Sequence, residues 1–354
     1  DKKLAGQAVS VSPYVGEREE GLSGRASPED LETLFQLVHL YFTEPRQDPA
    51  AFAALQERIR TFLQNRSQQP EAAFSDTLQV TLGQYHPRRL PFTMDDLAAL
   101  DAEAALDFYR DRFADASDFT FVLVGAFEPE QVEPLVEQYL ATLPATGREE
   151  EPRDLGIEPP EGVVEKTVRR GIEPKARVQL VFSGDLQETD GGAAARQERY
   201  RLGALADALR IRLREELREE RGGVYGVGVS ANADRMDGTY TVSIGFGADP
   251  ERVEDLTAAV FEQIEAFQQE GPDAQTIAKV KEQDRRAQEV GLEENPTWLG
   301  ALAAAYRYGE DPQRYLDRTD LVDALTAAAV QAAAQAYLDS ERYVRVVLLP
   351  EGEG

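Results

Sequence analysis

Two residues with side chains suited to binding a peptide, Arg218 and Tyr225, lie seven positions apart in the stretch LREELREERGGVYGVGV, residues 213–229. A guanidinium supplies charged donors in a fixed geometry, and a phenol supplies one donor that can follow charge developing on an oxyanion. If both side chains reach one cleft, they can hold a peptide carbonyl group. The alternative is structural: Arg218 then interacts with the carbonyl end of its helix, and Tyr225 is a half-buried strand aromatic.

The elements that would position this pair follow from leucine spacing and from glycines. A helix is expected over residues 193–221, with an apolar stripe of Leu202, Leu205, Leu209, Leu213 and Leu217. Gly222 or Gly223 is expected to end it in the left-handed conformation that follows many helices. A strand then begins near residue 224 and pairs with a second strand, up to residue 246, across an Asp-Gly turn typical of hairpins.

Other catalytic chemistry is absent from the sequence. It has two histidines, His39 and His86, and no cysteine, and neither H-E-x-x-H nor H-x-x-E-H occurs. His39 lies in an apolar helical pattern and His86 in a turn before a proline, so both are interpreted as structural. Glutamate pairs such as those of residues 215–220 recur throughout the chain and are assigned to the solvated surface. We therefore predict no catalytic residue and no metal ligand in this chain.

The composition excludes several classes of partner. The 354 residues carry a formal net charge of −27, so the surface repels nucleic acid and anionic lipid head groups. No apolar run approaches the roughly eighteen residues that a membrane span needs. Arginine far outnumbers lysine, which suits a high-salt habitat but also follows from a GC-rich genome. The length suggests two globular domains, with no nucleic-acid partner and no membrane insertion.

An internal repeat organises the chain. Residues 94–125 and 321–349 each combine a helical pattern with a β-branched run, FTFVLV in the first and YVRVVLL in the second. At an offset of 228, Leu97 matches Leu325, Ala104 matches Ala332 and Tyr109 matches Tyr337. At offsets of 222 and 225, Pro28 matches Pro250, Asp48 matches Asp273 and Pro87 matches Pro312. Matches in the same order indicate a duplication.

The second copy begins earlier than the first. Residues 163–184 read as strands and 193–221 as a long helix, and their counterparts would lie before residue 1, so the chain is expected to be a fragment. We predict an α+β fold of two homologous domains, each an antiparallel sheet with helices on one face, the first truncated at its N-terminus. The predicted domains are residues 1–147 and 163–354, with a Pro-, Gly- and charge-rich linker at 148–162.

The stretch LREERGGVY resembles a signature of the pitrilysin/insulinase-type zinc metallopeptidases, L-R-x-x-x-G-x-x-Y on a helix–turn–strand of their C-terminal half. Residues 20–48 and 119–144 resemble parts of the third of four repeated domains in large bacterial members. The resemblance covers essentially the whole chain. It implies a clamshell of two halves, each of two similar α+β domains, in which the N-terminal half binds zinc through H-x-x-E-H.

For this chain, the resemblance implies that Arg218 and Tyr225 bind substrate and stabilise an oxyanion. Zinc and the catalytic glutamate would belong to the N-terminal half, which is the implied partner together with peptide substrates. The fragment alone is then expected to be inactive. Because the family includes inactive members, the alternative is a non-catalytic scaffold or a peptide-binding subunit of a larger assembly. The resemblance favours a periplasmic or extracellular location over a cytoplasmic one.

Overall fold

The computed structural model describes residues 4–150, 153–187 and 192–352, and the side chain of Tyr225 lies outside this described part. The chain divides into two compact units. Unit 1 consists of Asp1–Phe62, Phe92–Leu155 and Asn295–Tyr306, and unit 2 of Leu63–Pro91, Gly156–Glu294 and Arg307–Gly354. Neither unit is a single continuous stretch of sequence.

Unit 2 is built on a five-stranded sheet with the strand order β3-β7-β4-β6-β5. The strands are β3 (Val163–Arg169), β4 (Ala176–Asp185), β5 (Val224–Asp234), β6 (Thr239–Ala248) and β7 (Tyr343–Leu349). Neighbouring strands are antiparallel except β3 and β7, which are parallel and far apart in the sequence, as a crossover connection requires. The predicted α+β class is confirmed, with a mixed sheet.

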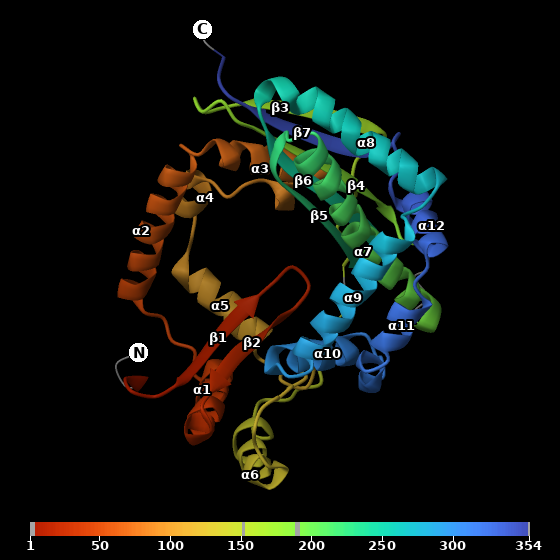
Figure 1. Ribbon diagram of the computed structural model, residues 1–354. Coiled ribbons are helices and arrows are strands. Elements are labelled where there is room, and N and C mark those ends of the chain that lie inside the picture. The colour runs from red at the N-terminus through yellow and green to blue at the C-terminus, as the bar shows by residue number, and fades with distance from the viewer. Residues whose placement is uncertain (1–3, 151–152, 188–191, 353–354) are drawn as a thin grey trace. The chain divides into compact units, whose positions relative to one another are not determined.

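One face of this sheet is covered by helices (Figure 1). The helices of unit 2 on this side are α7 (Gly192–Arg214), α8 (Val253–Gln269), α9 (Ala274–Gly291), α11 (Arg318–Ala324) and α12 (Ala327–Tyr337), with the short turns η6 (Pro250–Arg252) and η7 (Pro312–Tyr315). The predicted leucine stripe, which continues from α7 into the following residues up to Leu217, is fully buried in the main core, and α7 packs on β5. The expected hairpin between β5 and β6 is present, and Gly238 takes a φ of +66° in its turn.

The opposite face of the sheet is covered only in part. Helix α3 (Pro70–Leu82), followed by η3 (Pro87–Arg89), packs there on β3 and β7. Its Phe74, 2% exposed, contacts the side chains of β4 and β7 that point away from the main core: Val181, Val344, Val346 and Leu348. Helices therefore cover more than the one face that we predicted, because α3 supplies a second apolar layer.

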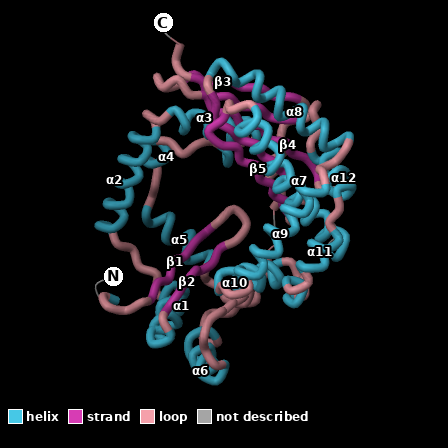
Figure 2. Tube along the Cα trace, in the orientation of Figure 1, coloured by secondary structure: helices cyan, strands magenta, loops and turns pink. Residues whose placement is uncertain are grey.

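Unit 1 begins with a two-stranded antiparallel hairpin (Figure 2). Its elements are β1 (Val9–Val15), β2 (Glu20–Ala26), η2 (Pro28–Asp30), α1 (Leu31–Thr43), the larger part of α2 (Pro49–Arg66), α4 (Met94–Ala98), α5 (Ala102–Arg112), α6 (Pro129–Leu135), the π-helical turn η4 (Val136–Leu140), and α10 (Asn295–Arg307). A small core forms around Phe42, Phe113 and Leu143. The expected strand FTFVLV, residues 119–124, is not a strand, because an extended segment needs a hydrogen-bonded neighbour and none pairs with it among the described residues.

The structure corrects the register of the repeat. Helix α9 begins and ends 225 residues after α2, and α10 and α12 do the same relative to α3 and α5. Leu97 thus corresponds to Val322 and Phe113 to Leu338, all four buried, whereas the sequence matches at 228 were wrong. A shift of three residues is close to one helical turn, so an Ala-rich helix keeps its apolar face in either register.

Candidate functional site

The helix that carries Arg218 changes its geometry at the predicted site. Regular α-helix ends at Arg214, and residues Glu215–Glu220 continue as the π-helical segment η5. The helix expected over 193–221 is therefore present, with its C-terminal residues in π-helical rather than α-helical form. π-Helical turns are rare and occur frequently at functional sites, because the extra residue turns the following side chains to a new direction. Arg218 lies in this segment and is exposed.

Ion pairs hold the π segment in place. Glu216 is buried and accepts a hydrogen bond from Nε of Arg221 at 2.8 Å, and a second guanidinium, that of Arg212, lies 3.6 Å away. Glu215 pairs with Lys279 of α9 at 2.7 Å. Arg218 takes part in none of these pairs, so the segment that carries it is fixed by its neighbours while its own guanidinium faces solvent.

Two glycines end the segment, each for a different reason. Gly222 has a φ of +60°, so it is the residue in the predicted left-handed position. Gly223 donates its N–H to the carbonyl of Leu217 at 3.1 Å. A Cβ on Gly223 would lie 2.9 Å from Cδ2 of Leu256, closer than packing allows. Together the two glycines bring the chain from η5 directly into β5.

Tyr225 occupies an irregular position of the edge strand β5. The pairing of β5 with β6 shifts between Val224 and Gly226, so Tyr225 is the extra residue of a β-bulge. Bulges of this kind redirect side chains and are common next to active sites. Because the Tyr225 side chain lies outside the described part of the structure, its predicted convergence with Arg218 stays a prediction.

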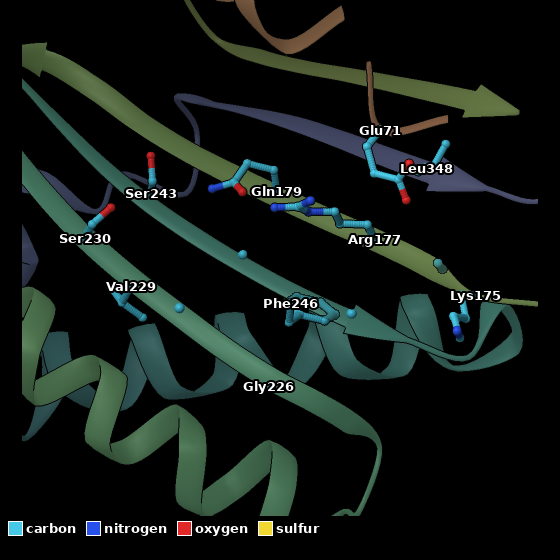
Figure 3. Close-up of a pocket in the computed structure, with 14 residues that line it drawn as sticks. Glu71, Lys175, Arg177, Gln179, Gly226, Val229, Ser230, Ser243, Phe246 and Leu348 are labelled. Carbon is cyan, nitrogen blue, oxygen red and sulfur yellow. The ribbon is translucent and has the colours of Figure 1, made fainter. Parts of the chain in front are cut away.

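A pocket of about 700 Å³ begins at the residue after Tyr225 (Figure 3). It lies on the face of β4, β6 and β5 opposite to α7, and its lining includes three cross-strand pairs of small residues. These pairs are Gly226 with Gly247, Gly228 with Gly245, and Ser230 with Ser243. With so little side chain on its floor, the pocket leaves the sheet surface open to an incoming chain.

Longer side chains from β4 and α3 border this floor. Figure 3 shows Arg177 and Gln179 on β4 and Glu71 approaching from α3. Cζ of Arg177 lies 5.5 Å from the ring centroid of the buried Phe74, a cation–π distance that holds the guanidinium in place. Lys175, also in the lining, is paired with Glu173 at 2.8 Å. The pocket therefore combines a flat floor with a fixed cation.

Sequence reasoning missed this pocket. A signal was present: glycine alternates with valine in GVGV, residues 226–229, and glycine recurs two residues apart at Gly245 and Gly247. Period-two glycines place a row without side chains on one face of a sheet. From the sequence we assign a role only to Gly222 or Gly223, at the end of the helix, and the facing pair on β6 is evident only from the strand register.

The two histidines have structural roles. His39 donates from Nδ1 to the carbonyl of Tyr139 at 2.8 Å, and His86 accepts from the N–H of Arg88 and so caps η3. Within the described ranges, no group of three or more His, Asp or Glu side chains is arranged to hold a metal ion. Nor does any described helix combine the length and apolar character needed to cross a membrane.

Comparison with known proteins gives consistent matches. The family description "Peptidase M16 inactive domain" matches residues 99–283. The zinc protease PQQL-like protein of Arabidopsis thaliana is 28% identical over 352 residues, and the probable zinc protease PqqL of Haemophilus influenzae is 23% identical over 341 residues. The alignments cover 91% and 95% of this chain but only 36% and 35% of those proteins, so the chain spans about a third of their length.

Solved structures share the fold. The periplasmic protease PqqL from Escherichia coli matches with a TM-score of 0.84 and 22% identity, over 99% of this chain and 38% of that chain. The peptidase M16 inactive domain from Pseudomonas fluorescens matches with a TM-score of 0.71 and 18% identity, over 100% of this chain and 82% of that one.

The resemblance to pitrilysin/insulinase-type peptidases is confirmed, since the family description matches more than half of the sequence. The chain belongs to the peptidase M16 inactive-domain family.

Proposed function

We propose that this chain is the C-terminal, non-zinc-binding half of a zinc metalloendopeptidase and forms one wall of its peptide-binding chamber. In this proposal, Arg218 and Tyr225 bind the substrate and stabilise the oxyanion. The observation that carries the proposal is the succession of a π segment, a glycine turn and a β-bulge, which ends where the pocket begins at Gly226. Two backbone irregularities within eleven residues, both at predicted binding residues, are more than a helix–strand connection requires.

The roles of the two side chains follow from their chemistry. The exposed guanidinium of Arg218 would donate to carbonyl oxygens of a bound peptide, and the phenol of Tyr225 would donate to the oxygen that gains charge in the transition state. Zinc, bound by the N-terminal half, would supply the activated water. The present chain would contribute orientation and charge stabilisation, and the proposed partners are the N-terminal half and peptide substrates.

The proposed location is the periplasm or the cell exterior. Its support is the Escherichia coli relative of the same fold, which is described as a periplasmic protease.

Replacing the two residues in the full-length parent protein tests the proposed roles. We expect Arg218→Gln and Tyr225→Phe each to lower kcat/KM on fluorogenic peptides by about 100-fold, the usual effect of removing one oxyanion donor. Arg214→Gln, the same charge change at an exposed position four residues earlier, should leave kcat/KM within about twofold. Circular dichroism would establish that all three variants fold. Wild-type kinetics in both Arg218→Gln and Tyr225→Phe would contradict the assignment.

Mixing the two halves separates the enzyme from the scaffold alternative. This chain alone should show no peptidase activity. Peptide turnover should appear when the N-terminal half and zinc are added, and it should disappear when a chelator removes the zinc. Turnover by this chain alone would mean that it contains a catalytic site of its own. Peptide binding by the mixture without any turnover would instead support a non-catalytic scaffold.

A further inference from the structure

Two glycines of the pocket floor, Gly226 and Gly228, are not required by close packing against the protein itself. Neither Gly226 nor Gly228 has a φ in the left-handed region that favours glycine. A Cβ on Gly226 would meet no atom within 4 Å, and one on Gly228 would approach only the carbonyl oxygen of Gly245, at 4.0 Å. Glycine weakens a strand interior, so a residue with a side chain would be more stable at either position. The remaining explanation for these two glycines is that they keep the space above the sheet free of side chains.

The neighbouring positions preserve this space. Gly245 faces Gly228 across the strands, and its missing side chain leaves room for Gln179, whose Oε1 lies 2.6 Å from where a Cβ would be. Ser230 and Ser243 continue the row with small hydroxyl side chains. Two adjacent strands thus present a row of three small cross-strand pairs, an elongated floor that suits an extended peptide better than a compact small molecule.

One border of this floor carries a fixed positive charge. The exposed guanidinium of Arg177 lies over the ring of Phe74, and among the described residues no carboxylate forms an ion pair with it. Of the described residues that line the pocket, only Glu71 is acidic, and Lys175 pairs with Glu173. A preorganised guanidinium of this kind binds a carboxylate with two parallel hydrogen bonds.

We propose that this pocket is a substrate subsite that takes an extended peptide segment across the glycine floor and recognises an Asp or Glu side chain of that segment through Arg177. The inference rests on the proposed peptidase function and names a specificity determinant for it. A side-chain carboxylate suits the site better than a terminal one. Capture of a terminal carboxylate uses free backbone N–H groups, and β4, which carries Arg177, is paired on both sides, with β6 and with β7.

Peptide binding to the full-length protein tests this inference without relying on turnover. With zinc removed by a chelator, fluorescence anisotropy would measure Kd for ten-residue peptides that are acetylated and amidated. Each peptide of the set has an uncharged sequence with a single Glu, and the position of this Glu differs from one peptide to the next. For each Glu peptide there is a matching peptide with Gln at the same position. At the position that reaches Arg177, we expect the Glu peptide to bind about tenfold more tightly, as for one hydrogen bond to a charged group.

Two variants and two matched controls locate the effect. Arg177→Gln should abolish the preference for Glu over Gln, while Arg169→Gln, the same charge change on β3 outside the pocket, should retain it. Gly228→Val should weaken binding of Glu and Gln peptides alike by tenfold or more, because its side chain would occupy the floor and its Cβ approaches only the carbonyl oxygen of Gly245, at 4.0 Å. Asn232→Val places the same valine side chain on the same face of β5 but beyond the pocket, and should change neither Kd.

The outcomes separate this inference from the function on which it rests. Equal binding of every Glu and Gln pair, or a Glu preference that survives Arg177→Gln, overturns the subsite while leaving the peptidase proposal intact. A preference seen only with free C-terminal carboxylates overturns the side-chain form of recognition. Failure of the protein to bind or cleave any peptide would overturn both proposals together.

Discussion

Asp115 shows how a single buried charge organises unit 1. Its carboxylate, 1% exposed, accepts hydrogen bonds from the N–H and hydroxyl groups of Ser117 and Thr146 and from the N–H of Arg148, all at 2.6–2.9 Å. These bonds, led by that from the Ser117 hydroxyl, hold the pKa of Asp115 well below its usual range. The charged carboxylate thereby fastens the segment after η4 to the end of α5.

This lowered pKa makes the stability of unit 1 sensitive to acid. A carboxylate with a depressed folded-state pKa stabilises the fold above its unfolded pKa of about 3.9 and loses that contribution as pH falls further. We expect Asp115→Asn to lower the urea midpoint at pH 7, and the gap from wild type to narrow below about pH 4. The single tryptophan, Trp298, belongs to unit 1, so its fluorescence reports this unit.

The control for this prediction is a neighbouring aspartate. Asp118 is exposed in the same loop, and Asp118→Asn should leave the urea midpoint unchanged both at pH 7 and below about pH 4. A gap between Asp115→Asn and wild type that stays constant from pH 7 to pH 3 would contradict the assigned role of the charge.

At the scale of elements, α3 completes unit 2 although it comes from the first repeat. Its Phe74 fills the layer formed by Val181, Val344, Val346 and Leu348, and it also supports Arg177 of the pocket. This contact links packing to the proposed subsite. Loss of the ring should therefore affect both the stability of β7 and the position of the guanidinium.

Truncating Phe74 should destabilise unit 2 strongly. For a buried phenylalanine replaced by alanine, the expected loss in the free energy of unfolding is about 3–5 kcal/mol, from lost transfer energy and the cavity left behind. Hydrogen exchange of the β7 amides, residues 343–349, would measure the loss where it occurs. Phe62→Ala removes a ring that is 60% exposed and should leave this exchange unchanged. Unaltered protection of β7 in Phe74→Ala would show that α3 does not hold the sheet.

At the scale of the whole molecule, the two repeats exchange equivalent helices. Helix α3 of the first repeat belongs to unit 2, and nearly all of its counterpart α10, which begins and ends 225 residues later, belongs to unit 1. A duplication alone would predict two self-contained domains. The exchange means instead that cutting the chain between the repeats leaves unit 2 without the helix that covers part of its sheet.

A fragment of residues 163–354 tests this dependence. Without residues 63–91 it should expose the apolar patch that Phe74 covers, bind the dye ANS and associate in size-exclusion chromatography, since uncovered patches of this kind drive association. Adding a peptide of residues 63–91 should reduce ANS fluorescence, whereas the same peptide carrying Phe74→Ala should not. A monomeric fragment that does not bind ANS would contradict the dependence.

The sequence by itself determined the class of fold, the duplication, the long amphipathic helix and its glycine end. These follow from local periodicity and from glycine and proline chemistry, which act over a few residues. It also singled out Arg218 and Tyr225 as candidates through a short motif. The repeat offset of 228 failed because alanine-rich helices tolerate a shift of about one turn, whereas helix ends do not.

Only the tertiary structure decided the rest. The segment FTFVLV does not form a strand because no described segment pairs with it, which no local propensity reveals. The π segment is held by ion pairs such as that of Glu215 with Lys279, 64 residues away. The pocket depends on the register that sets Gly228 opposite Gly245 and on α3 bringing Phe74 beneath Arg177. Each of these features joins residues distant in sequence, and such contacts are set by the packing of the whole fold rather than by the residues nearby.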